Sequence, residues 1–195
     1  MPATLQNLAA IIKSKAKNKA HFVIAISGFG GSGKSTVAKK LNSALKKSTI
    51  ISLDSFIIDR LSKRSKAWSG FDWTRLIEQV LKPIKSDKDT IRYDVYDWAE
   101  NKNRPGQPLQ VPKYIIVEGV GLIRNSLKNY FDFSIWIDVP LKTASEQGKK
   151  RDREEQQIDH DKLWDELWTP NDKDYYKKYQ PKSNVDFILE TNFQK

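Results

Sequence analysis

A glycine-rich turn between a strand-like run and a helix-like run constrains this chain more than any other feature. Residues 28–36 read Gly-Phe-Gly-Gly-Ser-Gly-Lys-Ser-Thr and fit the pattern G-x-x-x-x-G-K-S/T. The apolar run Phe22–Ile26 precedes the turn, and Thr36–Leu41, which suits a helix, follows it. The pattern indicates a phosphate-binding loop only in such a strand–turn–helix context. We therefore term residues 28–36 the phosphate loop.

The residue types of the phosphate loop suit a nucleoside triphosphate. Glycines let backbone N–H groups converge on phosphate oxygens, and the N-terminus of the following helix adds its partial positive charge. Lys34 has the reach to contact the β- and γ-phosphates, and the Ser35 hydroxyl suits the Mg²⁺ that bridges them. A Gly/Ser turn without a ligand is the alternative. We expect ATP and Mg²⁺, bound by Gly28, Gly30, Gly31, Ser32, Gly33, Lys34, Ser35 and Thr36.

Length and composition exclude several classes of protein. The chain has 195 residues, which suits one domain over 1–195, and it has no cysteine, which excludes disulfides and thiolate sites. No apolar run approaches the length of a membrane span, and the N-terminus has no signal-peptide core, so we expect a cytoplasmic protein without a membrane partner. The net charge of +10 keeps a nucleic-acid-binding NTPase as an alternative. The positive residues are scattered, however, and we do not expect nucleic acid as a partner.

Strand-like and helix-like runs alternate along the chain. Apolar strands are expected at 22–27, 49–53, 113–117, 133–140 and 185–189, and helices at 4–17, 34–46, 72–83, 141–157 and 159–179. We further expect a strand over 90–98, alone or as part of a hairpin, and a turn with Pro and Gly over 101–112. The alternation predicts an α/β fold, a doubly wound three-layer sandwich with a mostly parallel sheet.

Two of the apolar strands end in a carboxylate. Asp54 follows the strand 49–53, and Glu118 closes the strand 113–117. Ligands of open parallel sheets bind beyond the carboxyl ends of the strands. We therefore expect Asp54 to act as general base or to orient an acceptor hydroxyl, and Glu118 to hold Mg²⁺ together with Ser35. Capping of a turn is the alternative role for each carboxylate.

Two later segments are candidates for contacts with the ligands. The helix 141–157 resembles a lid that brings arginines onto the phosphates, with Arg151 as the catalytic candidate, and we place the whole lid-like segment at 141–180. A solvated charged face is the alternative. In the polar segment 59–71 and just after it, the rings of Trp68, Phe71 and Trp73 either stack on a flat substrate or anchor the loop by packing, and both interpretations stay open.

The order of these pieces resembles the uridine kinase and phosphoribulokinase group of phosphate-loop kinases, over about residues 20–190. The resemblance implies a nucleoside-kinase-like fold, with Asp54 acting on the acceptor hydroxyl and with Asp72, Tyr93 and Tyr96 lining the acceptor site. The matching segments are Leu53-Asp54-Ser55-Phe56, Phe71-Asp72, Tyr96-Asp97, Val117-Glu118-Gly119 and Arg151-Asp152.

Two positions depart from the pattern of that family. Uridine kinases commonly place a histidine shortly after the Tyr-Asp pair, where this chain has Trp98 to Asn101, and Gly148 stands where the lid would carry an arginine. The resemblance implies an ATP-dependent kinase acting on a hydroxyl of a small-molecule acceptor, a nucleoside or related compound, with Arg60 or Arg92 available if the acceptor is anionic. A nucleotide-binding regulatory ATPase without an acceptor is the alternative, and a homo-oligomer stays open.

Overall fold

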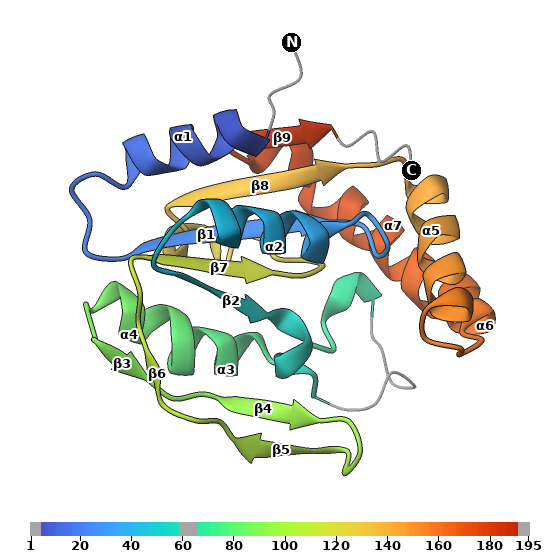
Figure 1. The fold of residues 1–195 in the computed structure, drawn as a ribbon. Coiled ribbons are helices and arrows are strands. Elements are labelled where there is room, and N and C mark those ends of the chain that lie inside the picture. The colour runs from blue at the N-terminus through green and yellow to red at the C-terminus, as the bar shows by residue number, and fades with distance from the viewer. Residues whose placement is uncertain (1–4, 59–65, 191–195) are drawn as a thin grey trace.

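The core of the fold is a sheet of five parallel strands in the order β2-β7-β1-β8-β9. The computed structural model describes residues 5–58 and 66–190. Helices flank the sheet (Figure 1), so the α/β prediction with a mostly parallel sheet is confirmed. The strands are β1 (Phe22–Gly28), β2 (Ser48–Ser52), β7 (Tyr114–Glu118), β8 (Phe133–Asp138) and β9 (Phe187–Glu190).

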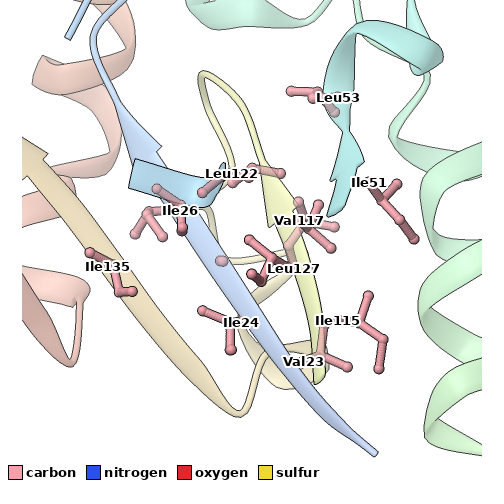
Figure 2. Close-up of a cluster of buried hydrophobic side chains, with 14 of the residues drawn as sticks. Val23, Ile24, Ile26, Ile51, Leu53, Ile115, Val117, Leu122, Leu127 and Ile135 are labelled. Atoms are coloured by element: carbon pink, nitrogen blue, oxygen red, sulfur yellow. The ribbon is translucent and has the colours of Figure 1, made fainter. Parts of the chain in front are cut away.

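The central strand, β1, is buried along its whole length. All of its seven residues are buried, because β7 and β8 pair with its two edges and helices cover both faces of the sheet. A parallel strand covered on both faces needs an unbroken apolar run rather than alternation, and the sequence of β1 has such a run. Figure 2 shows the side chains that pack there: Val23, Ile24, Ile26, Ile51, Leu53, Ile115, Val117, Leu122, Leu127 and Ile135.

Helices cover both faces of the sheet. In Figure 1, α2 (Lys34–Ala44) lies in front of the sheet with α1 (Leu5–Lys15) beside it, and α7 (Thr169–Tyr179) lies behind. The helices α5 (Leu141–Glu154) and α6 (Asp161–Leu163) stand at the end to which the strands point. A π-helical turn, Trp164–Trp168, joins α6 to α7. No helix within residues 5–58 and 66–190 is long and apolar enough to cross a membrane.

The segment of residues 73–110, which precedes β7, differs from the prediction. The helical stretch α3 (Trp73–Leu76), with the π-helical turn Ile77–Leu81 and α4 (Lys82–Lys85), is followed by four short strands. These form two antiparallel pairs. The strands are β3 (Thr90–Ile91), β4 (Asp94–Asp97), β5 (Lys102–Pro105) and β6 (Leu109–Gln110).

The hairpin alternative for the strand 90–98 agrees with the antiparallel pairing of β4 and β5, whereas the prediction of a turn over 101–112 is wrong, because β5 and β6 lie there. The residues of β5 are polar or proline and all exposed, so β5 has no apolar run that would reveal it. Asn101 has φ 54, a left-handed conformation that Asn tolerates, and it reverses the chain between β4 and β5.

The strand register brings the ends of three strands to one level. Glu118 on β7 stands opposite Ile26 on β1 and opposite Ser52 on β2. The phosphate loop follows β1, and Asp54 lies two residues after Ser52 in a 3₁₀ turn, Leu53–Phe56. The carboxyl edge of the sheet therefore collects the loop, Asp54 and Glu118, as expected for an open parallel sheet.

Candidate active site

The Lys34 side chain is folded back onto the phosphate loop. Its Nζ donates to the Phe29 carbonyl oxygen at 2.7 Å, and the residue is 7% exposed. Burial lowers the pKa of the ammonium, while the carboxylates of Asp172, Glu118 and Asp54 oppose the shift. Because burial disfavours the charged form, an anionic partner such as a phosphate would stabilise the ammonium.

The first backbone N–H groups of α2 are candidate donors to an anion. The residue before it, Gly33, has φ 85 and provides no side-chain cap. The first N–H groups of a helix have no partner within the helix, so they are available to an anion. Gly28 and Ser32, also predicted to bind phosphate, are buried and line neither of the two cavities described below. The Gly30 N–H donates to Asp172 at 2.7 Å.

Ser35 and Glu118 form a pair of oxygen donors beside the loop. The Ser35 hydroxyl donates to Glu118 Oε2 at 3.1 Å, and Glu118 is 7% exposed. Mg²⁺ prefers oxygen ligands, usually one or two carboxylates together with phosphate oxygens and water. A hydroxyl and a carboxylate in contact at the phosphate loop fit that preference.

Asp54 is exposed on the 3₁₀ turn that follows β2. The turn is capped by Ser52, whose hydroxyl accepts from the Asp54 N–H at 3.4 Å, so the Asp54 carboxylate does not perform this capping role. The carboxylate lines a cavity that also contains Lys34 and Arg151. Asp54 is thus available to a molecule in that cavity.

Two cavities meet at the phosphate loop. The α2–α5 cavity has a volume of about 620 Å³ and is lined by Thr36, Lys39 and Gln147 among others. The aromatic cavity has a volume of about 470 Å³, and its walls include Asp54, Trp68, Phe71, Trp98, Trp164 and Trp168. The residues that line both cavities are Gly31, Lys34, Ser35 and Arg151.

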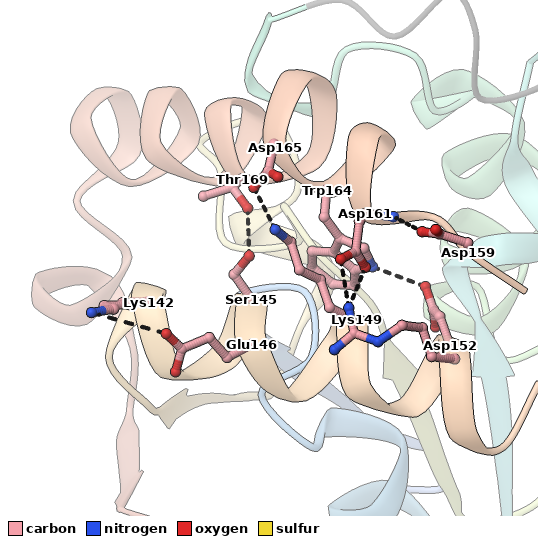
Figure 3. A network of polar contacts seen from close by, with 11 residues as sticks. Lys142, Ser145, Glu146, Lys149, Asp152, Asp159, Asp161, Trp164, Asp165 and Thr169 are labelled. Atoms are coloured by element: carbon pink, nitrogen blue, oxygen red, sulfur yellow. Dashed lines mark hydrogen bonds and ion pairs between the residues drawn. The ribbon is translucent and has the colours of Figure 1, made fainter.

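Arg151 is held by the residue that follows it. Its Nε and Nη2 donate to Asp152 Oδ1 at 3.0 and 2.6 Å. The other carboxylate oxygen of Asp152 accepts from Trp164 Nε1 at 2.8 Å, a contact drawn in Figure 3, and lies 3.3 Å from His160 Nδ1. Asp152 is 1% exposed, so a buried carboxylate orients both an arginine and a histidine of the lid-like segment.

The three residues predicted to line the acceptor site have other partners. Asp72 caps α3 by accepting from the Arg75 N–H at 2.9 Å, and it also pairs with the Arg75 guanidinium. The Tyr93 ring stacks on Phe56 at 5.5 Å, and Tyr96 is 6% exposed. The structure brings none of Asp72, Tyr93 and Tyr96 into either of the two cavities.

The model of the phosphoribulokinase / uridine kinase family matches residues 23–192 of this chain. The chain belongs to this family. Among its relatives, a uridine kinase of Borrelia duttonii is 26% identical over 177 residues, covering 86% of this chain and 85% of the relative. A pantothenate kinase of Streptomyces avermitilis is 29% identical over 143 residues, 60% of this chain and 44% of the relative.

The fold is also similar to a solved structure from this group of kinases. A possible uridine kinase from Bacillus stearothermophilus superposes with a TM-score of 0.72 and covers 95% of this chain and 96% of its own. Its sequence identity is 19%, so the likeness concerns the fold. Membership of the phosphoribulokinase / uridine kinase family makes this chain a kinase with a nucleotide-binding phosphate loop.

Gly148, which departs from the family pattern, is explained by packing in the lid-like segment. A Cβ at this position would lie 2.2 Å from the Trp164 ring, and a Cβ at Gly31 would lie 2.0 Å from the Ala144 carbonyl oxygen. α5 therefore packs closely against two neighbours. Gly31 of the phosphate loop contacts α5 at Ala144, and Gly148 of α5 contacts the Trp164 ring. No arginine fits at residue 148 while Trp164 occupies this place.

We expect Gly148→Ala to lower the free energy of unfolding by about 2 kcal/mol, because overpacking costs about that much. In an open helix the same change stabilises by roughly 0.5–1 kcal/mol, so the sign separates the two situations. Urea denaturation measures the difference. The control is Gln147→Ala on the exposed face of the same helix, for which we expect little change. A Gly148→Ala protein more stable than the wild type would contradict the packing of Trp164 against this glycine.

No sequence pattern predicted that aromatic and imidazole side chains near α6 and in the turn after it would line the aromatic cavity. His160 and Trp168 line this cavity and lie edge to face, with ring centroids 5.4 Å apart. Trp68 and Phe71, for which stacking and packing stayed open, also line it, whereas Trp73 packs on the Arg124 guanidinium at 3.6 Å. No motif around His160 indicates a functional site, because His160 reaches the cavity only where the chain turns back between α5 and α6.

Proposed function

We propose that this kinase transfers the γ-phosphoryl group of ATP to a hydroxyl of a small metabolite. The observation that carries the proposal is the meeting of the two cavities at Gly31, Lys34, Ser35 and Arg151. A donor nucleotide in the α2–α5 cavity would direct its terminal phosphate toward the aromatic cavity. An acceptor in the aromatic cavity would then lie beside Asp54.

Each residue of the junction has a role in this proposal. Asp54 orients the acceptor hydroxyl and receives its proton as the new P–O bond forms and the bond to the β-phosphate oxygen breaks. Lys34 and Arg151 stabilise the negative charge on the transferred group and on the ADP that leaves. Phosphoryl transfer depends mainly on positioning and electrostatics, so this small set of groups suffices.

Ser35 and Glu118 would hold Mg²⁺, as their contact through oxygen atoms supports. When bound there, the ion would neutralise part of the charge of the phosphates. Within the chain, Ser35 stands at the first turn of α2 and Glu118 at the end of β7, so both oxygens are supplied by regular elements. Such rigid placement favours a reproducible geometry.

We expect Glu118→Gln to raise the Mg²⁺ concentration for half-maximal ATP consumption at least about 10-fold, because an amide lacks the charge of the carboxylate. The measurement is a Mg²⁺ titration of ATP turnover. Glu146→Gln is the control, since Glu146 is exposed on α5 and pairs only loosely with Lys142, at 4.0 Å (Figure 3). An unchanged Mg²⁺ requirement in Glu118→Gln would remove Glu118 from this role.

For the acceptor we propose a nucleoside or a related compound with a flat ring. Indole and phenyl rings line the aromatic cavity, among them Trp68, Phe71 and Trp98, and such rings favour stacking on a planar group. The uridine kinase relatives support the same class. The pantothenate kinase relative is the reason to include vitamins in any test.

The decisive experiment is a screen of nucleosides, vitamins and sugar acids for ATP consumption, with the mass of the product as readout. We expect a product heavier than its acceptor by one phosphoryl group, and we expect it from a nucleoside. Slow ATP hydrolysis with no phosphorylated product from any compound would instead support the regulatory ATPase.

A further inference from the structure

A carboxylate on α7 contacts the phosphate loop and the wall of the aromatic cavity at the same time. Asp172 Oδ2 accepts from the Gly30 N–H at 2.7 Å, and Asp172 Oδ1 accepts from Trp68 Nε1 at 2.7 Å. The residue is 1% exposed. Gly30 and Asp172 are 142 residues apart in sequence, and α7 lies behind the sheet in Figure 1.

In both of these contacts the Asp172 carboxylate is the acceptor. Such a group accepts hydrogen bonds and donates none, and both partners here are N–H donors. Hydrogen bonds to a charged acceptor are short and stronger than neutral ones, which agrees with the two distances. A buried charge is costly unless it is paired in this way, so Asp172 retains its position by keeping both contacts.

The backbone at Trp68 is strained and held from several sides. Ala67 has φ 55 and Trp68 has φ 60, and a left-handed conformation is unfavourable for both residue types. The Trp68 N–H donates to Asn171 Oδ1 at 3.2 Å, and the Ala67 carbonyl oxygen accepts from Arg124 Nη2 at 3.2 Å. Strained residues persist where their surroundings over-determine them, and such places cluster at functional sites.

We propose that Asp172 is a positioning residue. Through its contacts with Gly30 and Trp68, it fixes the position of the phosphate loop relative to the wall of the aromatic cavity. Occupation of the loop by a nucleotide then changes the surroundings of the Trp68 indole, although Trp68 lies on the acceptor side. The inference rests on the nucleotide-binding part of the proposed function and does not depend on which acceptor is used.

The test uses the full chain labelled with 5-fluorotryptophan and observed by fluorine NMR. The Trp68 signal is assigned with Trp68→Phe, and Mg²⁺ with a non-hydrolysable ATP analogue is the probe. In the wild type we expect the Trp68 signal to shift and to saturate with the analogue. In Asp172→Asn we expect the analogue to bind, as calorimetry would show, and the Trp68 shift to be lost, because the amide presents an NH₂ group to one of the two donors.

Asp132→Asn is the matched control. Asp132 is also a nearly buried carboxylate, which accepts from the Val23 N–H at 2.8 Å and pairs with Lys19 and Lys85, but it lines neither of the two cavities. We expect this variant to be less stable and to keep the full Trp68 response. A role of Asp172 in stability alone would make the two variants behave alike.

A second measurement avoids dependence on the folding of Asp172→Asn. Trp68→Phe keeps an aromatic ring and removes only the N–H that Asp172 accepts. By hydrogen exchange, we expect the analogue to protect residues 28–36 and 66–73 in the wild type, and only residues 28–36 in Trp68→Phe. Equal protection of both segments in the two proteins would overturn the inference.

Other outcomes separate this inference from the proposed function. If the analogue binds to the wild type and the chemical shift of Trp68 does not change, the role of Asp172 is overturned and the proposed function is not. An undiminished shift in Asp172→Asn has the same meaning. A Trp68 response in a protein that phosphorylates no acceptor would support Asp172 and reject the proposed transfer.

Discussion

We expect Lys34→Ala to lower kcat/KM for ATP by up to about 1000-fold, the loss typical of removing a group that stabilises charge in a transition state. The ammonium is desolvated by burial, so a phosphate at the loop would stabilise its charged form. We expect nucleotide affinity to fall as well, because in the proposed function Lys34 contacts the phosphates both before and during transfer. Steady-state kinetics and calorimetry with an ATP analogue measure the two effects.

The variant should still fold, so the loss can be attributed to the site. Lys34 contacts the Phe29 carbonyl oxygen, and alanine removes that one bond together with a buried charge whose burial is unfavourable. We expect the thermal unfolding temperature to stay close to that of the wild type. Lys40→Ala removes the same charge from an exposed position of α2 and serves as the control. Undiminished turnover and affinity in Lys34→Ala would reject the phosphate-loop assignment itself.

Asp54→Asn has the second large effect, a fall in kcat of at least about 100-fold with nearly unchanged nucleotide affinity, as expected when a general base is removed. The substitution keeps the shape of the side chain and removes its charge and basicity. Asp54 is exposed on its 3₁₀ turn, and Ser52 provides the cap, so the fold does not depend on this carboxylate. The split between kcat and affinity is the signature that distinguishes this role from phosphate binding.

The measurement needs the acceptor found in the screen and a direct binding assay for the nucleotide. Asp87→Asn is a suitable control, because Asp87 is exposed in the turn after α4 and its left-handed φ of 51 is tolerated by asparagine. We expect wild-type kinetics from that protein. Near-normal kcat in Asp54→Asn would exclude Asp54 as the base and leave orientation of the acceptor to other groups.

Much of the fold could be predicted because its signals are local. The strands of the parallel sheet are apolar runs, and the helices that flank it show helical periodicity or a capping residue such as Asp72. The positions of Asp54 and Glu118 followed from one rule, that parallel strands end at a common edge. By contrast, β5 is short, polar and exposed, so its pairing with β4 left no mark in the sequence.

The residues assigned to the acceptor site stay predictions, and in the structure they have other partners. Asp72 was assigned to the acceptor site through a family resemblance, yet Arg75, three residues later, pairs with its carboxylate. The side chains that do line the aromatic cavity come from distant segments, among them Trp98 and His160. A sequence pattern reports residue types and spacing, whereas the partner chosen by a polar side chain depends on what the fold brings near it.

The sequence by itself determined the phosphate loop, the parallel sheet and the edge at which Asp54 and Glu118 lie, because each follows from the conformational preferences of neighbouring residues. Only the tertiary structure decided that Gly148 leaves room for Trp164, and that Asp172 joins Gly30 to Trp68. Those contacts join residues far apart along the chain, and their energies depend on burial and exact distance. Spacing along the sequence encodes neither quantity.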